Sequence, residues 1–347
     1  MTYRFSIIIA VSIFSSCSLT RSIAPDAVKP TVTTQQVEFD TDDPAIWIHP
    51  TDPSQSLIVG TDKETNGGIY VFDLDGKIVN KVTGLQRPNN IDIAYRLMVA
   101  GNPTDVAVFT ERETNKIRIF SMPDLKPIDN GGIDVFVGET QRDPMGIALY
   151  TRPDDNAIFA IVGRKTGPSG SYLWQYHLQD RGNGVVGGAV VRKFGAFSGK
   201  KEIESIAVDN ENGYVYYSDE GAGVHKYYAD VSKGNQELAF FGNKDFKSDV
   251  EGISIYKSNE KDGYILVSDQ QANRFSIYSR SGSAGNPHQH IRLASIPFST
   301  LESDGSDVTS VNLGARFPKG LFVAMSNGKV FHYYDWRLIE DRIKPSK

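Results

Sequence analysis

Cysteine is almost absent from this chain of 347 residues, because the only one is Cys17 near the N-terminus. A single cysteine cannot form a disulfide within the chain, so stability must come from packing or from bound ions. The position of Cys17, far from the rest of the sequence, also excludes a phosphatase mechanism with a cysteine nucleophile.

Several other signals are missing. Long helical periodicity is nearly absent, and a net charge of only -5 argues against nucleic acid as a partner. The sequence has no G-x-S-x-G nucleophile elbow, and its six histidines form no arginine-flanked phosphatase motif. The G-x-G-x-x-G match at 182–187 leads into a predicted strand, which favours a hairpin over a dinucleotide site. The two histidines of 287–290 lie in a polar loop, which gives little support for a metal pair.

A short aromatic-rich strand pattern recurs six times. Its starts lie about 50 residues apart, a spacing typical of one propeller blade per unit. The six copies are IYVF (69–72), IRIF (117–120), LWQY (173–176), VHKY (224–227), FSIY (275–278) and VFHY (330–333). Since a propeller brings equivalent positions of every blade onto one face, residues distant in sequence are expected to converge.

Each unit extends backwards into two more apolar stretches, and most units end in a weaker fourth one. Turn signals such as Asn66-Gly67 and Asp75-Gly76 separate these stretches. Four antiparallel strands in each of six units predict an all-β fold, a six-bladed β-propeller. We expect 28–39 to supply the outer strand that closes the ring and 336–343 to form a short terminal helix.

The N-terminus has the features of an export signal. Arg4 is followed by a short apolar stretch at 5–14, too short to span a bilayer as a mature helix. Cys17 follows directly, which resembles a bacterial lipoprotein signal with Cys17 as the lipidated residue; a plain secretory signal is the alternative. The expected domains are a signal peptide (1–16), a polar tether (17–36) and a propeller (37–347). The predicted location is the periplasm, the outer membrane as a lipoprotein, or the exterior, with membrane contact only through a lipid.

Charged residues recur at the ends of the predicted strands. Because the first two strands of a unit are antiparallel, the start of one lies beside the end of the other, on one face. The acids at strand starts are Asp42, Asp43, Asp92, Glu204, Asp249, Glu251 and Asp307. The charged residues at strand ends are Lys63, Glu111, Arg112, Arg164, Lys165, Asp219, Glu220 and Asp269. Any one of these alone is read as ordinary surface charge. Together, crowded carboxylates suit calcium, and basic residues among them suit a phosphorylated ligand.

Particular motifs carry a family resemblance. DDPAIWIHP (42–50), GTDKETNGGIYVFDLDGK (60–77) and RPNNIDIAY (87–95) resemble the β-propeller phytases, as do VEGISIY (250–256) and DGYILVSDQQANRFSIY (262–278). The similarity spans about 39–339, and the first three motifs are the specific ones. The resemblance implies a calcium-dependent phosphomonoester hydrolase that acts on phytate or related phosphate esters. We expect a monomer that binds phytate as its calcium complex.

The resemblance also implies roles for single residues at matching positions. The implied metal ligands are Asp42, Asp43, Pro44, Glu204, Glu220, Asp249, Glu251 and Asp307. The implied catalytic residues are Lys63, Arg112, Lys165, Glu204 and Glu220. The implied substrate-binding residues are Lys63, Arg112, Arg164 and Lys165. In this reading, metal-activated water attacks phosphorus while the basic residues hold the phosphate.

The sequence departs from the family pattern at several positions. Glu64 stands in place of a second basic residue after Lys63, Met145 in place of a tyrosine, and Ser310 in place of a frequent acid. These departures indicate a divergent branch and leave two other functions open. One is another metal-dependent propeller hydrolase such as a lactonase, although three basic residues argue against it. The other is a non-enzymatic, lipid-tethered module that binds phosphorylated or carbohydrate ligands.

Overall fold

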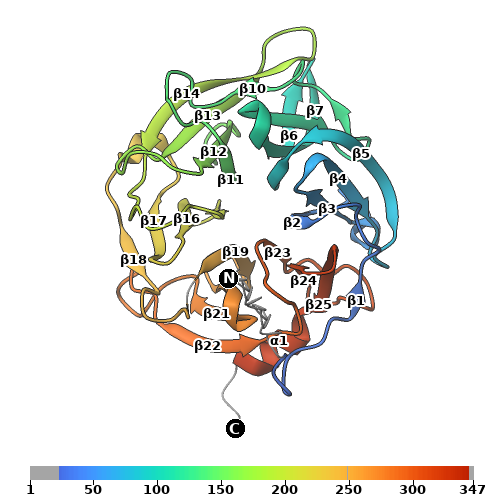
Figure 1. Cartoon of the computed structure of the whole chain (residues 1–347), viewed down its shortest axis with the longest axis vertical. Helices are drawn as coiled ribbons and strands as arrows, with labels where there is room; N and C mark the ends of the chain where they lie inside the picture. The colour runs from blue at the N-terminus through green and yellow to red at the C-terminus, as the bar shows by residue number, and fades with distance from the viewer. Residues whose placement is uncertain (1–22, 248, 344–347) are drawn as a thin grey trace, which may run out of the picture.

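The chain forms a ring of six antiparallel sheets around a common axis (Figure 1). The structure is a computed structural model that describes residues 23–247 and 249–343. The predicted all-β fold, a six-bladed β-propeller, is therefore confirmed. In each of the first five blades, the first strand in sequence lies next to the axis. The last blade differs because the N-terminal strand of the chain forms its outermost strand.

The first three blades follow one another along the chain. Blade 1 comprises β2 (Thr41–Trp47), β3 (Leu57–Asp62), β4 (Thr65–Phe72) and β5 (Ile78–Gln86). Blade 2 comprises β6 (Pro88–Val99), β7 (Asn102–Glu111), β8 (Lys116–Ser121), β9 (Lys126–Pro127) and β10 (Ile133–Asp134). Blade 3 comprises β11 (Pro144–Thr151), β12 (Ile158–Arg164), β13 (Leu173–Asp180) and β14 (Val186–Phe194).

The remaining blades complete the ring. Blade 4 comprises β15 (Ile206–Asp209), β16 (Tyr214–Asp219), β17 (Gly223–Tyr228) and β18 (Ala239–Phe241). Blade 5 comprises β19 (Val250–Lys257), β20 (Gly263–Asp269), β21 (Arg274–Ser279) and β22 (Arg292–Pro297). Blade 6 comprises β23 (Ser306–Thr309), β24 (Leu321–Ser326), β25 (Val330–Asp335) and β1 (Val32–Thr33). The predicted terminal helix is α1 (Trp336–Ile343).

Both ends of the described chain meet in blade 6, as Figure 1 shows. Val32 lies opposite Tyr333, and Val28 forms a further bridge to Phe298. The prediction that 28–39 close the ring is confirmed, but the expected tether boundary at 36 is wrong because residues from Val28 onwards already pair with the propeller. Gly76 permits this close approach, since its φ is +78° and a Cβ there would lie 2.9 Å from Cα of Thr34. The expected signal peptide and Cys17 lie outside the described residues.

The middle strands of the blades are apolar on both faces. Every residue of β12 is buried, because neighbouring blades cover the two faces of each sheet. Among the described residues, six hydrophobic clusters each fill the space between two adjacent blades. Phe331 of blade 6, for example, packs against Phe72 of blade 1. Trp336 of α1 stacks on Tyr256 of blade 5 with ring centroids 3.5 Å apart, which fixes the helix against the ring.

Carboxylates at the ends of the second strands hold the loops that lead into the blades. Asp62 accepts hydrogen bonds from the backbone N–H groups of Phe39 and Asp40, and Asp269 accepts one from Lys247. Glu111 and Asp219 bind loop amides in the same way. Asp62 is therefore structural, as are three of the charged residues that the sequence predicted at strand ends: Glu111, Asp219 and Asp269.

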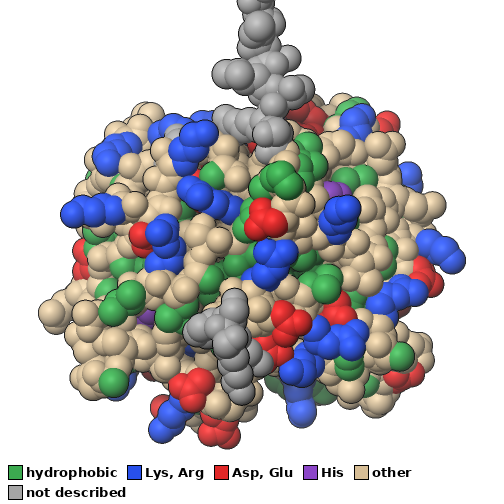
Figure 2. Space-filling view, turned by 90° about the horizontal axis from the view of Figure 1, so that it is seen from below, with side chains coloured by type: hydrophobic (Ala, Val, Ile, Leu, Met, Phe, Trp, Pro, Cys, Tyr) green, Lys and Arg blue, Asp and Glu red, His purple; other side chains and the backbone are tan. Residues whose placement is uncertain are grey.

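The outer surface carries mixed charge. On the side of the ring seen in Figure 2, basic and acidic side chains are interspersed with small hydrophobic patches. None of the described helices has the length and apolar character that a membrane crossing requires.

Candidate active site

The inner strands of the blades enclose a channel along the axis, with a cavity of about 610 Å³. Three aspartates form part of its wall, namely Asp43, Asp92 and Asp307. Each carboxylate accepts a hydrogen bond from a backbone N–H of the next blade: Asp43 from Ile91 (3.1 Å), Asp92 from Leu149 (2.7 Å) and Asp307 from Ile46 (2.8 Å). We call these three residues the channel-wall acids. They join adjacent inner strands and so help to close the ring.

Burial shifts the pKa of all three channel-wall acids upwards. It raises the pKa of Asp92 to about 6 and that of Asp307 to about 7. Burial also raises the pKa of Asp43 well above its usual value, and the neighbouring carboxylates of Asp42 and Asp307 add to the effect. Gly305 packs closely on Asp43, since a Cβ there would lie 2.2 Å from Oδ1. Any side chain at position 305 would therefore displace this carboxylate.

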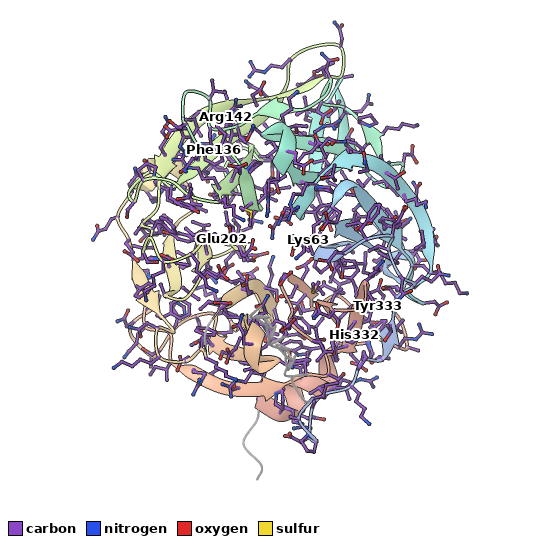
Figure 3. All side chains as sticks on the ribbon, in the orientation of Figure 1. Lys63, Phe136, Arg142, Glu202, His332 and Tyr333 are labelled. Atoms are coloured by element: carbon purple, nitrogen blue, oxygen red, sulfur yellow. The ribbon has the colours of Figure 1, made fainter. Side chains whose placement is uncertain are left out.

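A second group of acids lies at the mouth of the channel, where the inner strands begin. Lys63, which directly follows β3, is paired there with Asp42 (Nζ to Oδ1, 3.0 Å) and with Asp304. Asn89 donates to the other oxygen of Asp42 at 2.7 Å. Burial alone would lower the pKa of Lys63, but the two carboxylates hold it above its usual value, so the side chain remains cationic at neutral pH. Figure 3 shows Lys63 and Glu202 on opposite sides of this opening.

Glu204 and Glu251 complete the mouth. Burial raises the pKa of Glu204 well above its usual value, and the carboxylate of Asp42 raises it further. The pKa of Glu251 is raised in the same direction by burial and by the charge of Glu204. Burial also raises the pKa of Asp304 to about 6, although Lys63 opposes the shift. We refer to Asp42, Glu204, Glu251 and Asp304 as the mouth acids.

Beside the mouth acids, one group of carboxylates has the geometry of a metal site. Oxygens of Glu220, Asp249 and Glu251 all lie within 4.8 Å of one another, and all three residues are buried. Oε2 of Glu251 is buried and has no hydrogen-bond partner among the residues that the structure describes, so this oxygen is available to an ion. A set made only of carboxylate oxygens fits a hard divalent cation such as calcium. We call these three residues the metal group.

Comparison with known proteins assigns this chain to a family. The model of the phytase family matches residues 6–332. The chain belongs to the phytase family. A 3-phytase of Bacillus subtilis (strain 168) is 30% identical over 304 residues, which cover 83% of this chain and 75% of that protein. Family membership identifies the chain as a phosphoric monoester hydrolase that releases phosphate from phytate.

Solved structures agree with the fold alone. The hydrazine synthase of Kuenenia stuttgartiensis superposes with a TM-score of 0.50 at 12% identity, covering 85% of this chain and 83% of that chain. The Dos1 propeller gives a TM-score of 0.45 at 11% identity, with coverage of 85% and 68%.

The basic residues expected to bind phosphate fall into two groups in this phytase. Lys165 is 52% exposed and its Nζ lies 3.3 Å from Oε2 of Glu202 at the mouth. Arg112 contacts the sulfur of Met145, the residue that departs from the family pattern. Its Nε is buried and finds no hydrogen-bond partner in residues 23–247 and 249–343. Both side chains therefore keep donors that a phosphate can use.

Arg164, also expected to bind substrate, is buried. Only 1% of its side chain is exposed, and its guanidinium binds Oε2 of Glu139 (3.1 Å) and the carbonyl of Gln141 (3.2 Å). The same group lies over the ring of Phe136, 4.7 Å from its centroid. Arg164 therefore anchors the segment before β11 in this structure, and its expected role in substrate binding stays a prediction.

The expected metal ligands are likewise divided by the structure. It brings Glu220, Asp249 and Glu251 together and sets Asp42 and Glu204 near them at the mouth. Asp43, Pro44 and Asp307 instead line the channel, where the two carboxylates are occupied by backbone amides. The place at the mouth that sequence reasoning assigned to Asp307 is taken by Asp304.

Sequence reasoning missed Asp304, Asn89 and Lys201. Asp304 stands three positions before Asp307 in the stretch S-D-G-S-D-V, and only Asp307 aligned with the predicted strand. Asn89 is the third residue of the specific motif at 87–95, yet an amide carries no charge to draw attention. Lys201 is the second residue of the basic pair Lys200-Lys201, and such a pair is typical of the solvent-exposed surface. In each case the sequence offered one indication of a site residue, namely a polar side chain within a few positions of the start of an inner strand.

Proposed function

We propose that the phytate phosphatase reaction of this chain depends on calcium and takes place at the channel mouth. One observation carries the proposal: the buried metal group lies close enough to the mouth acids for the charges of Glu204 and Asp304 to raise the pKa of Glu251. Burying this many carboxylates in one place is unfavourable unless cations neutralise them. In a phytase, the cations also serve the reaction.

The metal group would hold calcium, with Glu204 and Asp42 facing the same space. When bound, calcium supplies an acidified water as nucleophile and neutralises the charge of a polyanionic substrate. The remaining work belongs to side chains of the chain. Arg112 and Lys165 bind phosphate oxygens and offset the negative charge that grows on them during transfer. Lys63 keeps Asp42 and Asp304 in fixed positions through its two ion pairs.

The proposal is tested by measuring phosphate release from phytate and from p-nitrophenyl phosphate, with added calcium and with excess chelator. We expect turnover of phytate only with calcium and a higher melting temperature in calcium than in chelator. Lys63→Ala should reduce turnover strongly, whereas Lys126→Ala, at a lysine 74% exposed on blade 2, should not. Undiminished release in excess chelator would contradict the calcium requirement. Saturable phytate binding without turnover would instead favour a binding module.

We further propose that the chain is exported and anchored by a lipid on Cys17. The basis is the sequence alone: Arg4, the apolar stretch 5–14 and the cysteine that follows. Fractionation of cells that produce the wild type or Cys17→Ala tests the proposal. The wild type should be recovered with membranes and labelled by radioactive palmitate, and the variant should not. Equal distribution of the two proteins would support a plain secretory signal.

A further inference from the structure

A lysine reaches into the metal group from outside. The ammonium of Lys201 lies 3.3 Å from Oε1 of Glu220 and forms a shorter hydrogen bond to Oδ1 of Asp249. Two of the three carboxylates in the metal group therefore share one lysine. The third, Glu251, keeps an oxygen without a partner.

Within the described part of the chain, the tip of Lys201 is held by these two contacts. Its side chain is 47% exposed, whereas the side chains of Glu220 and Asp249 are 10% and 9% exposed. A cavity of about 320 Å³, lined by Lys201, Asp249 and Phe246 among others, adjoins the ammonium. The stem can therefore swing away from the carboxylates into open space without disturbing the core.

We propose that Lys201 is a built-in monovalent cation that competes with the divalent ion for Glu220 and Asp249. The inference rests on the proposed calcium site and adds a residue that sets its affinity. With Lys201 in place, a positive charge stabilises the buried carboxylates. A divalent ion brings twice the charge to the same oxygens and displaces the ammonium, at the cost of its two ion pairs. Lys201 thus lowers the apparent calcium affinity and keeps the carboxylates compensated when calcium is scarce.

The neighbouring lysine provides a matched control. Lys200 is exposed, and its Nζ donates to the carbonyl of Gly221 at 2.8 Å rather than to a carboxylate. Lys200→Gln and Lys201→Gln therefore remove the same charge from adjacent positions, but only the second removes it from the metal group. Lys201→Arg keeps the charge and serves as a conservative rescue.

The experiment is calorimetric titration of calcium chloride alone into the chelator-treated full chain and its three variants. Lys201→Gln should bind calcium about three- to tenfold more tightly than Lys200→Gln, the factor expected when partly exposed ion pairs no longer oppose binding. Lys201→Arg should stay within about twofold of the wild type. In chelator Lys201→Gln should also melt at a lower temperature than Lys200→Gln, and the difference should close in saturating calcium.

Two results separate failure of this inference from failure of the proposed function. Equal calcium affinities for Lys201→Gln and Lys200→Gln, or weaker binding by Lys201→Gln, would overturn the competition while leaving the calcium site intact. No calcium binding by the wild type would overturn both, and phosphate release in chelator would then identify the cofactor assignment as the error. Because the readout is calcium binding, it does not depend on which ester the enzyme prefers.

Discussion

The channel-wall acids and the mouth acids are all carboxylates near the starts of inner strands, yet their surroundings differ. Asp92 and Asp307 each accept two backbone N–H groups, whereas Glu251 keeps a buried oxygen without a donor. Backbone amides are fixed donors, so an acid that binds them joins strands. An acid left without them needs a mobile cation, which is what a metal or a lysine provides.

The largest expected effect lies at the mouth. Glu251→Gln keeps the shape of the side chain but removes a metal-facing charge, so phosphate release from phytate should fall by about 100-fold or more. Because the change also removes a buried carboxylate whose pKa is raised by burial, the melting temperature in chelator should not fall. Steady-state kinetics and thermal melting check both. Glu260→Gln, at an exposed position, is the control; an active Glu251→Gln would place the chemistry elsewhere.

A substitution in the channel wall should have the opposite effect, with lower stability and nearly unchanged turnover. Asp92→Ala leaves the N–H groups of Ile93 and Leu149 without their acceptor, and the free energy of unfolding should fall by about 2–4 kcal/mol. Turnover per folded molecule should stay within about threefold of the wild type. Urea unfolding and kinetics at a temperature where the variant is folded make the comparison. Lost activity without lost stability would move Asp92 into the catalytic machinery.

Two arginines, Arg164 and Arg112, allow the same comparison between a structural role and a role in the reaction. Arg164→Ala removes the contacts to Glu139, Gln141 and Phe136 and should lower the free energy of unfolding by about 1–3 kcal/mol, with KM for phytate unchanged. Arg112→Ala should instead raise KM or lower kcat with little change in stability. Kinetics and urea unfolding of both variants decide the matter, and a raised KM for Arg164→Ala would support its predicted role.

The smallest expected effect is a dependence on pH. The pKa of Asp307 is raised by burial to about 7 in the folded chain, from an ordinary value of 3.8. The folded state therefore binds this proton more tightly than the unfolded state does. The stability that the protonated group contributes is present below about pH 4 and is lost as the pH rises through 7.

Asp307→Asn should accordingly flatten the fall in stability between about pH 4 and pH 7 in chelator. Urea unfolding across this range measures the slope for the wild type and the variant. Identical slopes would mean that Asp307 is ionised throughout, so that the N–H groups of Ile46 and Val308 and the charge of Lys257 offset the effect of burial.

Much of the fold could be predicted because each blade repeats a local pattern. The aromatic strand at 330–333 and its five equivalents occupy the same place in each blade. The recurring aromatic pattern and the turn residues beside it are therefore enough to locate them. The tether boundary failed because a two-residue strand such as Val32–Thr33 has too little pattern to be recognised. Its pairing with β25 depends on where the last blade ends.

The site was harder to predict because charge alone does not reveal a partner. Arg164 and Lys165 are adjacent in sequence, and only the fold buries one against Phe136 while exposing the other near Glu202. Asp304 and Asp307 were likewise indistinguishable by type. Their roles separate because strand β23 begins between them, so that one carboxylate reaches Lys63 and the other reaches an amide of the next blade.

The sequence by itself determined the six repeats and the motifs of the family, because these depend on short-range patterns. Only the tertiary structure decided which acids became parts of the wall and which remained ligands. The reason is that a carboxylate's role depends on the donors around it, and those donors come from blades that are distant in the chain.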